Sequence, residues 1–223
     1  MGAKELLDAK PILKNNFFSE ENTKVIYKIV NDAIISGESQ GKKYKYFFAN
    51  NNGMHILRFN TKNNTEYLTD KLSMSLLLER LQEQVSVSLK KEVINIGGYF
   101  GRYSKESGFT PMLEPHIDEA KIGEQYRMAL TSKLKSSLDW DILVEKEKYR
   151  LEENSALFFS ANLKIHCRPK EINFSKEDYY DILVLHFDFK DADPCPIDQE
   201  YLNKKASIHD DKELKIWYDS TRQ

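Results

Sequence analysis

The sequence predicts an α+β domain in which two N-terminal helices buttress one face of a β-sandwich or barrel. Apolar residues recur at helical spacing in two segments of the first 90 residues. The chain from there to residue 190 is a run of short segments rich in β-branched and aromatic residues. No internal repeat or low-complexity linker divides it, so we expect one domain over 1–223, with helices in 1–90, a β core in 91–190 and a tail in 191–223.

The first predicted helix begins after Ser19 and ends near Ile35. The Ser19 hydroxyl can cap the first-turn amides, and Glu20 and Glu21 suit the positive end of the helix dipole. A second helix is predicted over 69–90, and a short last helix is expected in the tail. The buried faces of the first two helices are predicted from apolar residues at helical spacing. These are Val25, Ile26, Ile29, Val30, Ala33 and Ile34 in the first helix, and Leu72, Leu76, Leu77, Leu81, Val85 and Leu89 in the second.

The predicted strands are bounded by polar turns. They cover residues 93–96, 99–103, 126–134, 141–144, 156–159 and 181–189. Gly97 and Gly98 separate the first two and indicate a bulge or the close approach of another backbone. The earlier segment 42–64 is interrupted at 50–53 by three Asn and a Gly, which predicts a hairpin with a loose turn.

The composition argues against several classes of protein. A hydrophobic fraction of 40%, with 12 Phe, 12 Tyr and 2 Trp, is enough to build a core. Lys plus Arg number 33 against 35 Asp plus Glu, and the basic runs are short, so we expect no nucleic-acid partner. Two cysteines without a CxxC spacing, and no apolar leader, predict a cytoplasmic setting. No apolar stretch approaches the roughly 20 residues that span a bilayer, so no membrane partner is expected.

The candidate chemistry lies in two of the five histidines, His116 and His166, and in the nearby Asp118. His116 and Asp118 are two residues apart, so on a strand both side chains leave the same face and can bind one ion. His166 follows a later apolar segment that an antiparallel sheet could fold back onto them. Two imidazoles and one carboxylate on one side of an ion leave positions open, the geometry associated with iron(II) that activates dioxygen.

A second His-x-Asp is formed by His186 and Asp188 within an apolar strand. Only His209 follows as a third ligand, so we interpret His186 as a hydrogen-bonded histidine of the sheet. Because the tripeptide recurs within one chain, it is weak evidence for a metal site by itself.

The first His-x-Asp stands in a longer pattern. Tyr99-Phe100-Gly101-Arg102-Tyr103 precedes Leu113-Glu114-Pro115-His116-Ile117-Asp118, and Leu157-Phe158-Phe159 leads to His166. Over about 92–189 this resembles the iron(II)- and 2-oxoglutarate-dependent dioxygenases of the double-stranded β-helix (jelly-roll) fold, and Phe17-Phe18-Ser19-Glu20-Glu21 looks like the opening helix of prolyl-hydroxylase-like members. The resemblance implies that His116, Asp118 and His166 are the iron ligands and the catalytic centre.

The resemblance also implies a cation that pairs with the far carboxylate of 2-oxoglutarate. Many members place an Arg at the start of the last core strand, whereas this chain has Lys176 near that point. Other members use the strand after His-x-Asp, which points to Arg127 or Lys133. Arg168 offers a guanidinium close to the distal histidine. We expect Arg127 and Arg168 jointly to bind the co-substrate, with a hydrogen bond from Tyr103. The alternatives are a surface ion pair for each arginine and a core position for the tyrosine.

The expected function is hydroxylation of an unactivated C–H bond of a small molecule, an amino acid or a peptidyl residue, with dioxygen and 2-oxoglutarate consumed. In the resembling family, a small residue in place of the aspartate is associated with halogenases, so Asp118 favours hydroxylation or a related oxidation. The main alternative is a cupin-like barrel that binds a metal or ligand without turning over 2-oxoglutarate. A third is an interaction domain in which His116 and His166 never meet. The sequence selects neither a substrate nor an oligomeric state.

Overall fold

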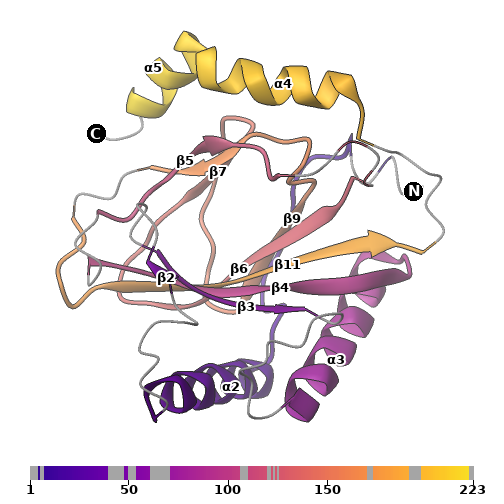
Figure 1. Ribbon diagram of the computed structural model, residues 1–223, viewed down its shortest axis with the longest axis vertical. Helices are drawn as coiled ribbons and strands as arrows, with labels where there is room; N and C mark the ends of the chain where they lie inside the picture. Colours follow the sequence, from indigo (N-terminus) through magenta and orange to yellow (C-terminus); the bar gives the residue numbers. More distant parts are fainter. Residues whose placement is uncertain are drawn as a thin grey trace.

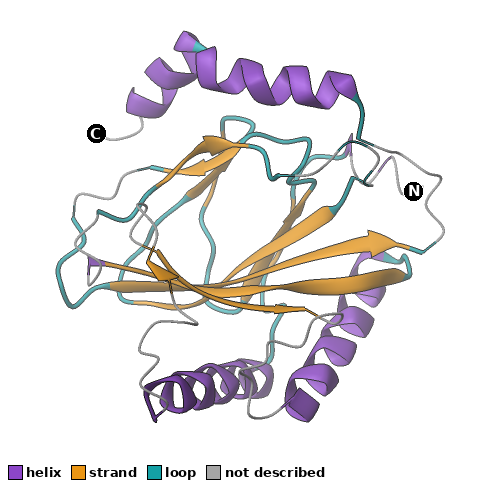
Figure 2. Ribbon diagram, in the orientation of Figure 1, coloured by secondary structure: helices purple, strands orange, loops and turns teal. Residues whose placement is uncertain are grey.

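Two antiparallel sheets face each other, and helices cover the outer face of each sheet (Figure 1). The computed structural model describes residues 5, 8–39, 48–49, 54–60, 71–105, 110–119, 122, 124, 126–169, 173–190 and 197–220. Helices α2 (Glu20–Ser39) and α3 (Lys71–Leu89) lie against the larger sheet, and α4 (Gln199–Asp210) and α5 (Lys212–Ser220) lie across the smaller one (Figure 2). The predicted α+β class is therefore confirmed.

The larger sheet has seven strands and the smaller has four. In spatial order the larger contains β1 (Ile12–Lys14), β9 (Ser155–Phe159), β6 (Met128–Ser136), β11 (Tyr179–Phe189), β4 (Val93–Ser104), β3 (Met54–Asn60) and β2 (Phe48–Ala49). The smaller contains β5 (Leu113–His116), β10 (His166–Arg168), β7 (Ile142–Val144) and β8 (Glu147–Tyr149). From β4 to β11 the chain alternates between the two sheets, except that β7 and β8 form a hairpin within the smaller one, which is the winding of a double-stranded β-helix.

The two N-terminal helices pack on the larger sheet as predicted. The Asn22 amide donates to the Ser19 hydroxyl at 3.1 Å, so Ser19 caps α2. The α3 face is rotated from the predicted one, because Leu78 is 1% exposed whereas Leu76 is 45% exposed. The expected burial of Leu76 is therefore wrong: Leu77, Leu78, Leu81 and Val85 define the stripe, and Leu76 lies beyond its edge. The side chains of Ala33, Ile34 and Leu72 lie outside the described residues.

The predicted hairpin and the predicted last helix are both present, and one further helix was not predicted. β2 and β3 pair antiparallel, which confirms the hairpin, and its turn at 50–53 lies outside the described residues. α5 matches the expected last helix, and the Leu214 amide donates to the Asp211 carboxylate at its start. α4 was not predicted, since its sequence is mostly polar. Among the described helices, none combines the length and apolarity required to cross a membrane.

The C-terminal helices contact the smaller sheet through a few apolar and polar groups. Ile208 and Leu214 share a buried cluster with Ile117, next to the end of β5. The Tyr218 hydroxyl donates to the backbone carbonyl of Arg168 at 3.1 Å. These contacts cover part of the outer face of the smaller sheet.

Gly97 and Gly98 meet both expectations for paired glycines. The register of β4 against β11 shifts between His186, opposite Gly97, and Asp188, opposite Ile94. β4 therefore carries an extra residue there, and Asn95 within the bulge has a φ of 55°. A Cβ at Gly98 would lie 1.9 Å from the carbonyl oxygen of Val184, so no side chain fits.

We expect Gly98→Ala to destabilise the protein by more than about 3 kcal/mol or to prevent folding, because overpacking costs ~1–3 kcal/mol even where side chains can move, and here the obstacle is backbone. Gly101→Ala on the same strand is the control, since its Cβ would meet only the side chains of Ile182 and Met54, at 3.1 and 3.2 Å. Urea unfolding of both variants measures the difference. Equal destabilisation would contradict the close approach.

Candidate metal centre

The pairing of β5 with β10 brings the two predicted histidines together. His116 and His166 are direct partners in the register of the smaller sheet, and their ring centroids are 4.2 Å apart. The next pair is Leu113 with Arg168, so β5 advances three residues while β10 advances two. This bulge contains Pro115, which has no amide to donate to a regular ladder.

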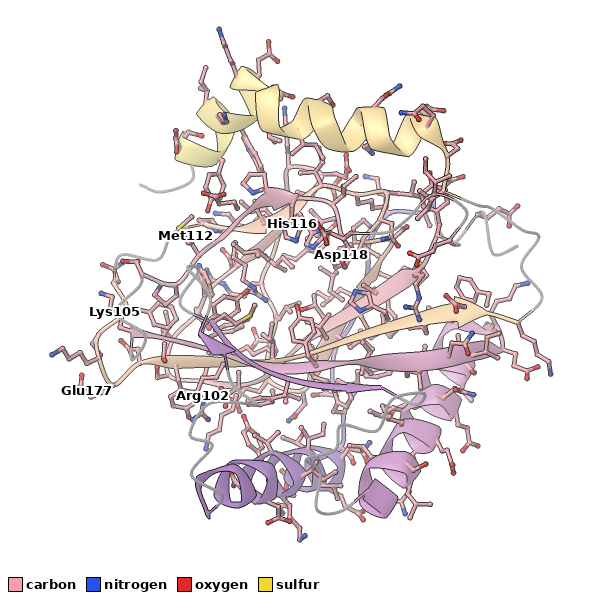
Figure 3. All side chains as sticks on the ribbon, viewed as in Figure 1. Arg102, Lys105, Met112, His116, Asp118 and Glu177 are labelled. Atoms are coloured by element: carbon pink, nitrogen blue, oxygen red, sulfur yellow. The ribbon has the colours of Figure 1, made fainter. Side chains whose placement is uncertain are left out.

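Asp118 completes a group of three ligand side chains. The ligand atoms of His116, Asp118 and His166 all lie within 4.8 Å of one another. The Asp118 Oδ1 is 3.5 Å from the Nε2 of each histidine. His116 and Asp118 lie between the sheets, on the side of the smaller one (Figure 3). The structure therefore brings together the three residues predicted to bind a metal.

The two imidazoles are held in the tautomer that a metal requires. The Nδ1 of His116 lies 2.7 Å from the carbonyl oxygen of Glu114, and the Nδ1 of His166 lies 3.1 Å from that of Lys164. A carbonyl only accepts, so each Nδ1 carries the proton and each Nε2 presents a lone pair to the site. Such backbone contacts also fix the orientation of the rings.

The electrostatics favour the protonation states of metal ligands. Burial raises the pKa of Asp118, but the three histidines around its carboxylate, His116, His166 and His186, outweigh it and hold the pKa well below its usual range. Burial, with His116 as a neighbour, lowers the pKa of His166. An ionised carboxylate and a neutral imidazole bind a cation without first losing protons.

The backbone of Asp118 is fixed by the loop between β9 and β10. Its amide donates to the carbonyl of Ala161 at 2.9 Å, and the side-chain amide of Asn162 donates to its carbonyl at 3.3 Å. The Asn162 Oδ1 also accepts from the amide of Arg127 at 3.0 Å. A single side chain, 3% exposed, thus joins the segment before β6 to the turn that contains Asp118.

A cavity lies beside the three ligands, between the two sheets. Its wall is mostly apolar and aromatic, with Thr131, Arg168 and the ligands as its polar members. The lining residues are Tyr99, Tyr103, Leu113, His116, Asp118, Ala129, Thr131, Ile142, Phe159, Ala161, His166, Arg168, Ile182 and Val184. Residues from both sheets therefore enclose the space next to the candidate ion.

Arg168 is a buried cation with an unused donor. It is 1% exposed, its Nη1 donates to the carbonyl of Trp140 at 3.0 Å, and its Nη2 has no hydrogen-bond partner among the described residues. The guanidinium lies over the rings of Tyr180 and Trp140, 4.7 and 5.2 Å from their centroids. Burial raises the pKa of Tyr103 to about 12, although Arg168 opposes the shift, so this hydroxyl stays protonated.

The other predicted co-substrate residues lie elsewhere. Arg127 precedes β6 and does not line the cavity: its Nε pairs with Asp188 at 2.9 Å and its Nη2 donates to the carbonyl of Asn95. Lys133 pairs with Asp139 at 3.3 Å, and Lys176 is exposed. Of the expected set, Arg168 and Tyr103 share the cavity with the triad, and Arg127 does not.

His186 contacts the candidate ligand Asp118, which the sequence did not indicate. Its Nε2 lies 2.7 Å from Oδ2 of Asp118, so the second His-x-Asp touches the first. The recurrence of the tripeptide was the one signal for this contact, and the sequence alone did not reveal its meaning.

No protein-family model and no curated protein sequence matches the chain. Solved structures do match. A prolyl hydroxylase from Trichoplax adhaerens, in complex with a hypoxia inducible factor oxygen degradation domain peptide fragment, has a TM-score of 0.52 and 11% identity over 84% of this chain and 87% of that chain. The α-ketoglutarate-dependent epimerase SnoN from nogalamycin biosynthesis has a TM-score of 0.54 and 7% identity over 88% and 92%.

A third match is HygX from Streptomyces hygroscopicus, with nickel, 2-oxoglutarate and hygromycin B bound. Its TM-score is 0.51, with 7% identity over 88% of this chain and 96% of that chain. These identities establish the fold alone: the chain has the double-stranded β-helix fold of these three proteins.

We expect His116→Ala and His166→Ala each to weaken Co(II) binding by more than ~100-fold, because loss of even an outer partner of a metal ligand costs ~10–100-fold. Isothermal titration calorimetry measures the affinity.

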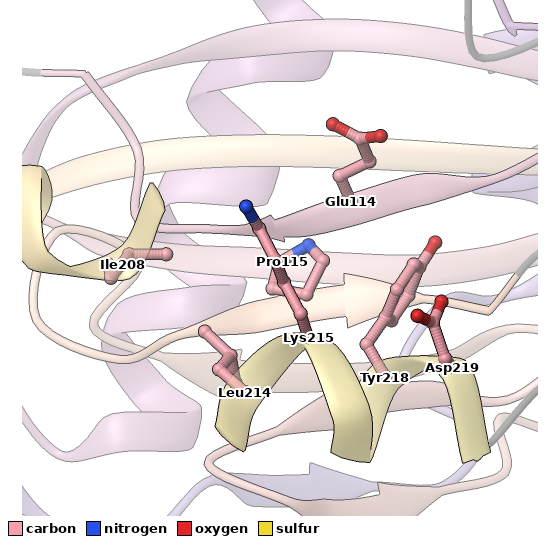
Figure 4. A pocket seen from close by; sticks show the side chains of 7 residues that line it. All are labelled: Glu114, Pro115, Ile208, Leu214, Lys215, Tyr218 and Asp219. Atoms are coloured by element: carbon pink, nitrogen blue, oxygen red, sulfur yellow. The ribbon is translucent and has the colours of Figure 1, made fainter. Parts of the chain in front are cut away.

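Glu114→Gln is the matched control. Glu114 lies on the strand of His116, but its side chain lines a hollow between β5 and α5 together with Lys215, Tyr218 and Asp219 (Figure 4). Its affinity should equal that of the unmutated protein, and undiminished binding in either alanine variant would contradict the assignment.

Proposed function

We propose that the protein is an oxygenase that depends on Fe(II) and 2-oxoglutarate. His116, Asp118 and His166 would hold the iron, and Arg168, assisted by Tyr103, would bind the far carboxylate of 2-oxoglutarate. The observation behind this proposal is a buried, unpaired guanidinium donor in the same cavity as two imidazoles and a carboxylate.

The donor set fits iron(II) and leaves room for further ligands. Two neutral imidazoles and one ionised carboxylate on one side of an ion match the 2-His-1-carboxylate arrangement of non-haem iron oxygenases. The ring tautomers and the clamped backbone of Asp118 preset this arrangement. The residues present therefore fit the group that the fold implies.

The state of Arg168 fits an anionic co-substrate. An isolated buried cation costs several kcal/mol, and proteins usually offset that cost with a buried anion. No described carboxylate pairs with Arg168, and its neighbours are aromatic rings and carbonyl groups. A carboxylate that enters the cavity would receive the unused Nη2 donor, and guanidinium geometry suits it. The cavity measures about 50 Å³, so its walls must open for a five-carbon diacid.

Iron bound here would supply the activation of dioxygen that couples decarboxylation of 2-oxoglutarate to oxidation of the substrate. The protein would bind and orient. Arg168 and the protonated Tyr103 would fix the co-substrate carboxylate, and the apolar wall with Ile142, Phe159 and Val184 would exclude water from the reacting groups. We infer hydroxylation of a C–H bond in a small molecule, an amino acid or a peptidyl residue; the matched prolyl hydroxylase holds a peptide fragment and HygX holds hygromycin B. SnoN shows that epimerisation occurs on the same fold.

The competing function is that of a cupin-like protein, which binds a metal without consuming 2-oxoglutarate. The donor set alone fits both functions, and Arg168 favours the oxygenase.

Anaerobic addition of Fe(II) and 2-oxoglutarate should produce a visible charge-transfer band in the unmutated protein and none in His116→Ala or His166→Ala. On admission of oxygen, succinate should form. Iron binding without a band would support the cupin-like alternative, and the absence of iron binding would contradict the site altogether.

Two arginine variants separate the candidate co-substrate residues. Arg168→Met should abolish the band while changing the free energy of unfolding by no more than ~1 kcal/mol, because it removes a buried unpaired cation and keeps most of the volume. Arg127→Met should keep the band and lower stability by ~1 kcal/mol, since it breaks a partly exposed pair with Asp188. The reverse pattern would assign the co-substrate to Arg127.

A further inference from the structure

The second His-x-Asp of the chain lies on β11, at the centre of the larger sheet. His186 and Asp188 are partly exposed on one face, whereas Phe187 between them is fully buried on the other, in the core that includes the helices. The partners of His186 across the sheet are Gly97 on β4 and Ala129 on β6. These small neighbours leave space for the imidazole to reach across to the smaller sheet.

The two oxygens of the Asp118 carboxylate have different surroundings. Oδ1 is 3.5 Å from the Nε2 atoms of both His116 and His166. Oδ2 is 2.7 Å from the Nε2 of His186. An ionised carboxylate only accepts, so the His186 Nε2 carries the proton and donates it. A donor on the outer oxygen leaves the inner one to bind an ion.

His186 is not itself one of the grouped ligands. The described residues whose ligand atoms lie within 4.8 Å of one another are His116, Asp118 and His166. An Nε2 that donates to a carboxylate has no lone pair to offer a metal. We therefore propose, resting on the metal site assigned above, that His186 is a positioning residue, which holds Asp118 so that only Oδ1 faces the ion.

The strand that carries His186 is itself anchored to the same loop as Asp118. Asp188 pairs with Arg127 at 2.9 Å and accepts from the side chain of Asn95 at 2.9 Å. The amide of Arg127 donates to Asn162, and Asn162 donates to the carbonyl of Asp118. His186 thus donates to the carboxylate of Asp118. Asp188 is linked to the backbone of Asp118 through Arg127 and Asn162.

The test compares His186→Phe, which keeps a ring and removes the donor, with His186→Gln, whose amide can donate from a similar position. The readouts are Co(II) affinity by calorimetry and the Co(II) visible spectrum, both without 2-oxoglutarate, together with the unfolding free energy of the metal-free protein. We expect ~10–100-fold weaker binding in His186→Phe, as for outer partners of metal ligands, and recovery of most of the affinity in His186→Gln. The Gln variant should retain the unmutated Co(II) spectrum.

Glu114→Gln, whose side chain lies outside the ligand group, is again the control, and its Co(II) affinity should stay close to the unmutated value. A His186→Phe variant that binds Co(II) as tightly as the unmutated protein overturns the positioning role and leaves the metal site intact. Equal losses in the Phe and Gln variants, with an altered Co(II) spectrum, would make His186 a fourth ligand and also overturn it. If the unmutated protein binds no Co(II), the proposed function fails and this inference fails with it.

Discussion

The antiparallel pairing of β5 with β10 is the interaction on which the site depends. It places His116 opposite His166, and the bulge of β5 then places Leu113 opposite Arg168. One short ladder thus brings together the two candidate metal ligands and Arg168, whose Nη2 has no partner among the described residues. The ladder is supported from outside, since Tyr218 on α5 donates to the carbonyl of Arg168. The helices over the smaller sheet therefore stabilise the geometry of the cavity from behind.

The site contains two charged side chains, Asp118 and Arg168, that a bound metal and an anionic ligand would neutralise. Asp118 is ionised beside neutral imidazoles, and Arg168 is charged with no described anion beside it. The histidines around Asp118 favour its ionised form, whereas a buried cation with no described anion beside it costs stability that a bound carboxylate would offset. A positive and a negative group in the wall of one cavity suit a ligand that chelates a metal and also carries an anionic group.

The sequence predicted what depends on local spacing and missed what depends on distant strands. The cap at Ser19 and the proximity of His116 to Asp118 follow from neighbouring residues, and the glycine pair indicated a close backbone approach without identifying β11 as the partner. The choice between Arg127 and Arg168 does not, because it depends on Asp188, which reaches Arg127 only when β11 lies beside β6. The contact of His186 with Asp118 likewise joins two sheets, and no periodicity within either strand indicates it.

The place of β11 at the centre of the larger sheet has a consequence for how the chain folds. Its neighbours, β4 and β6, both precede it in sequence, so neither can complete its ladder until residues 179–189 insert between them. Until then, two long strands expose unpaired edges of the kind that associate with other chains. Non-local pairing of this type is slow. Aggregation during refolding should therefore depend on how fast this strand docks, and substitutions that slow its insertion should lower yield even where the folded protein tolerates them.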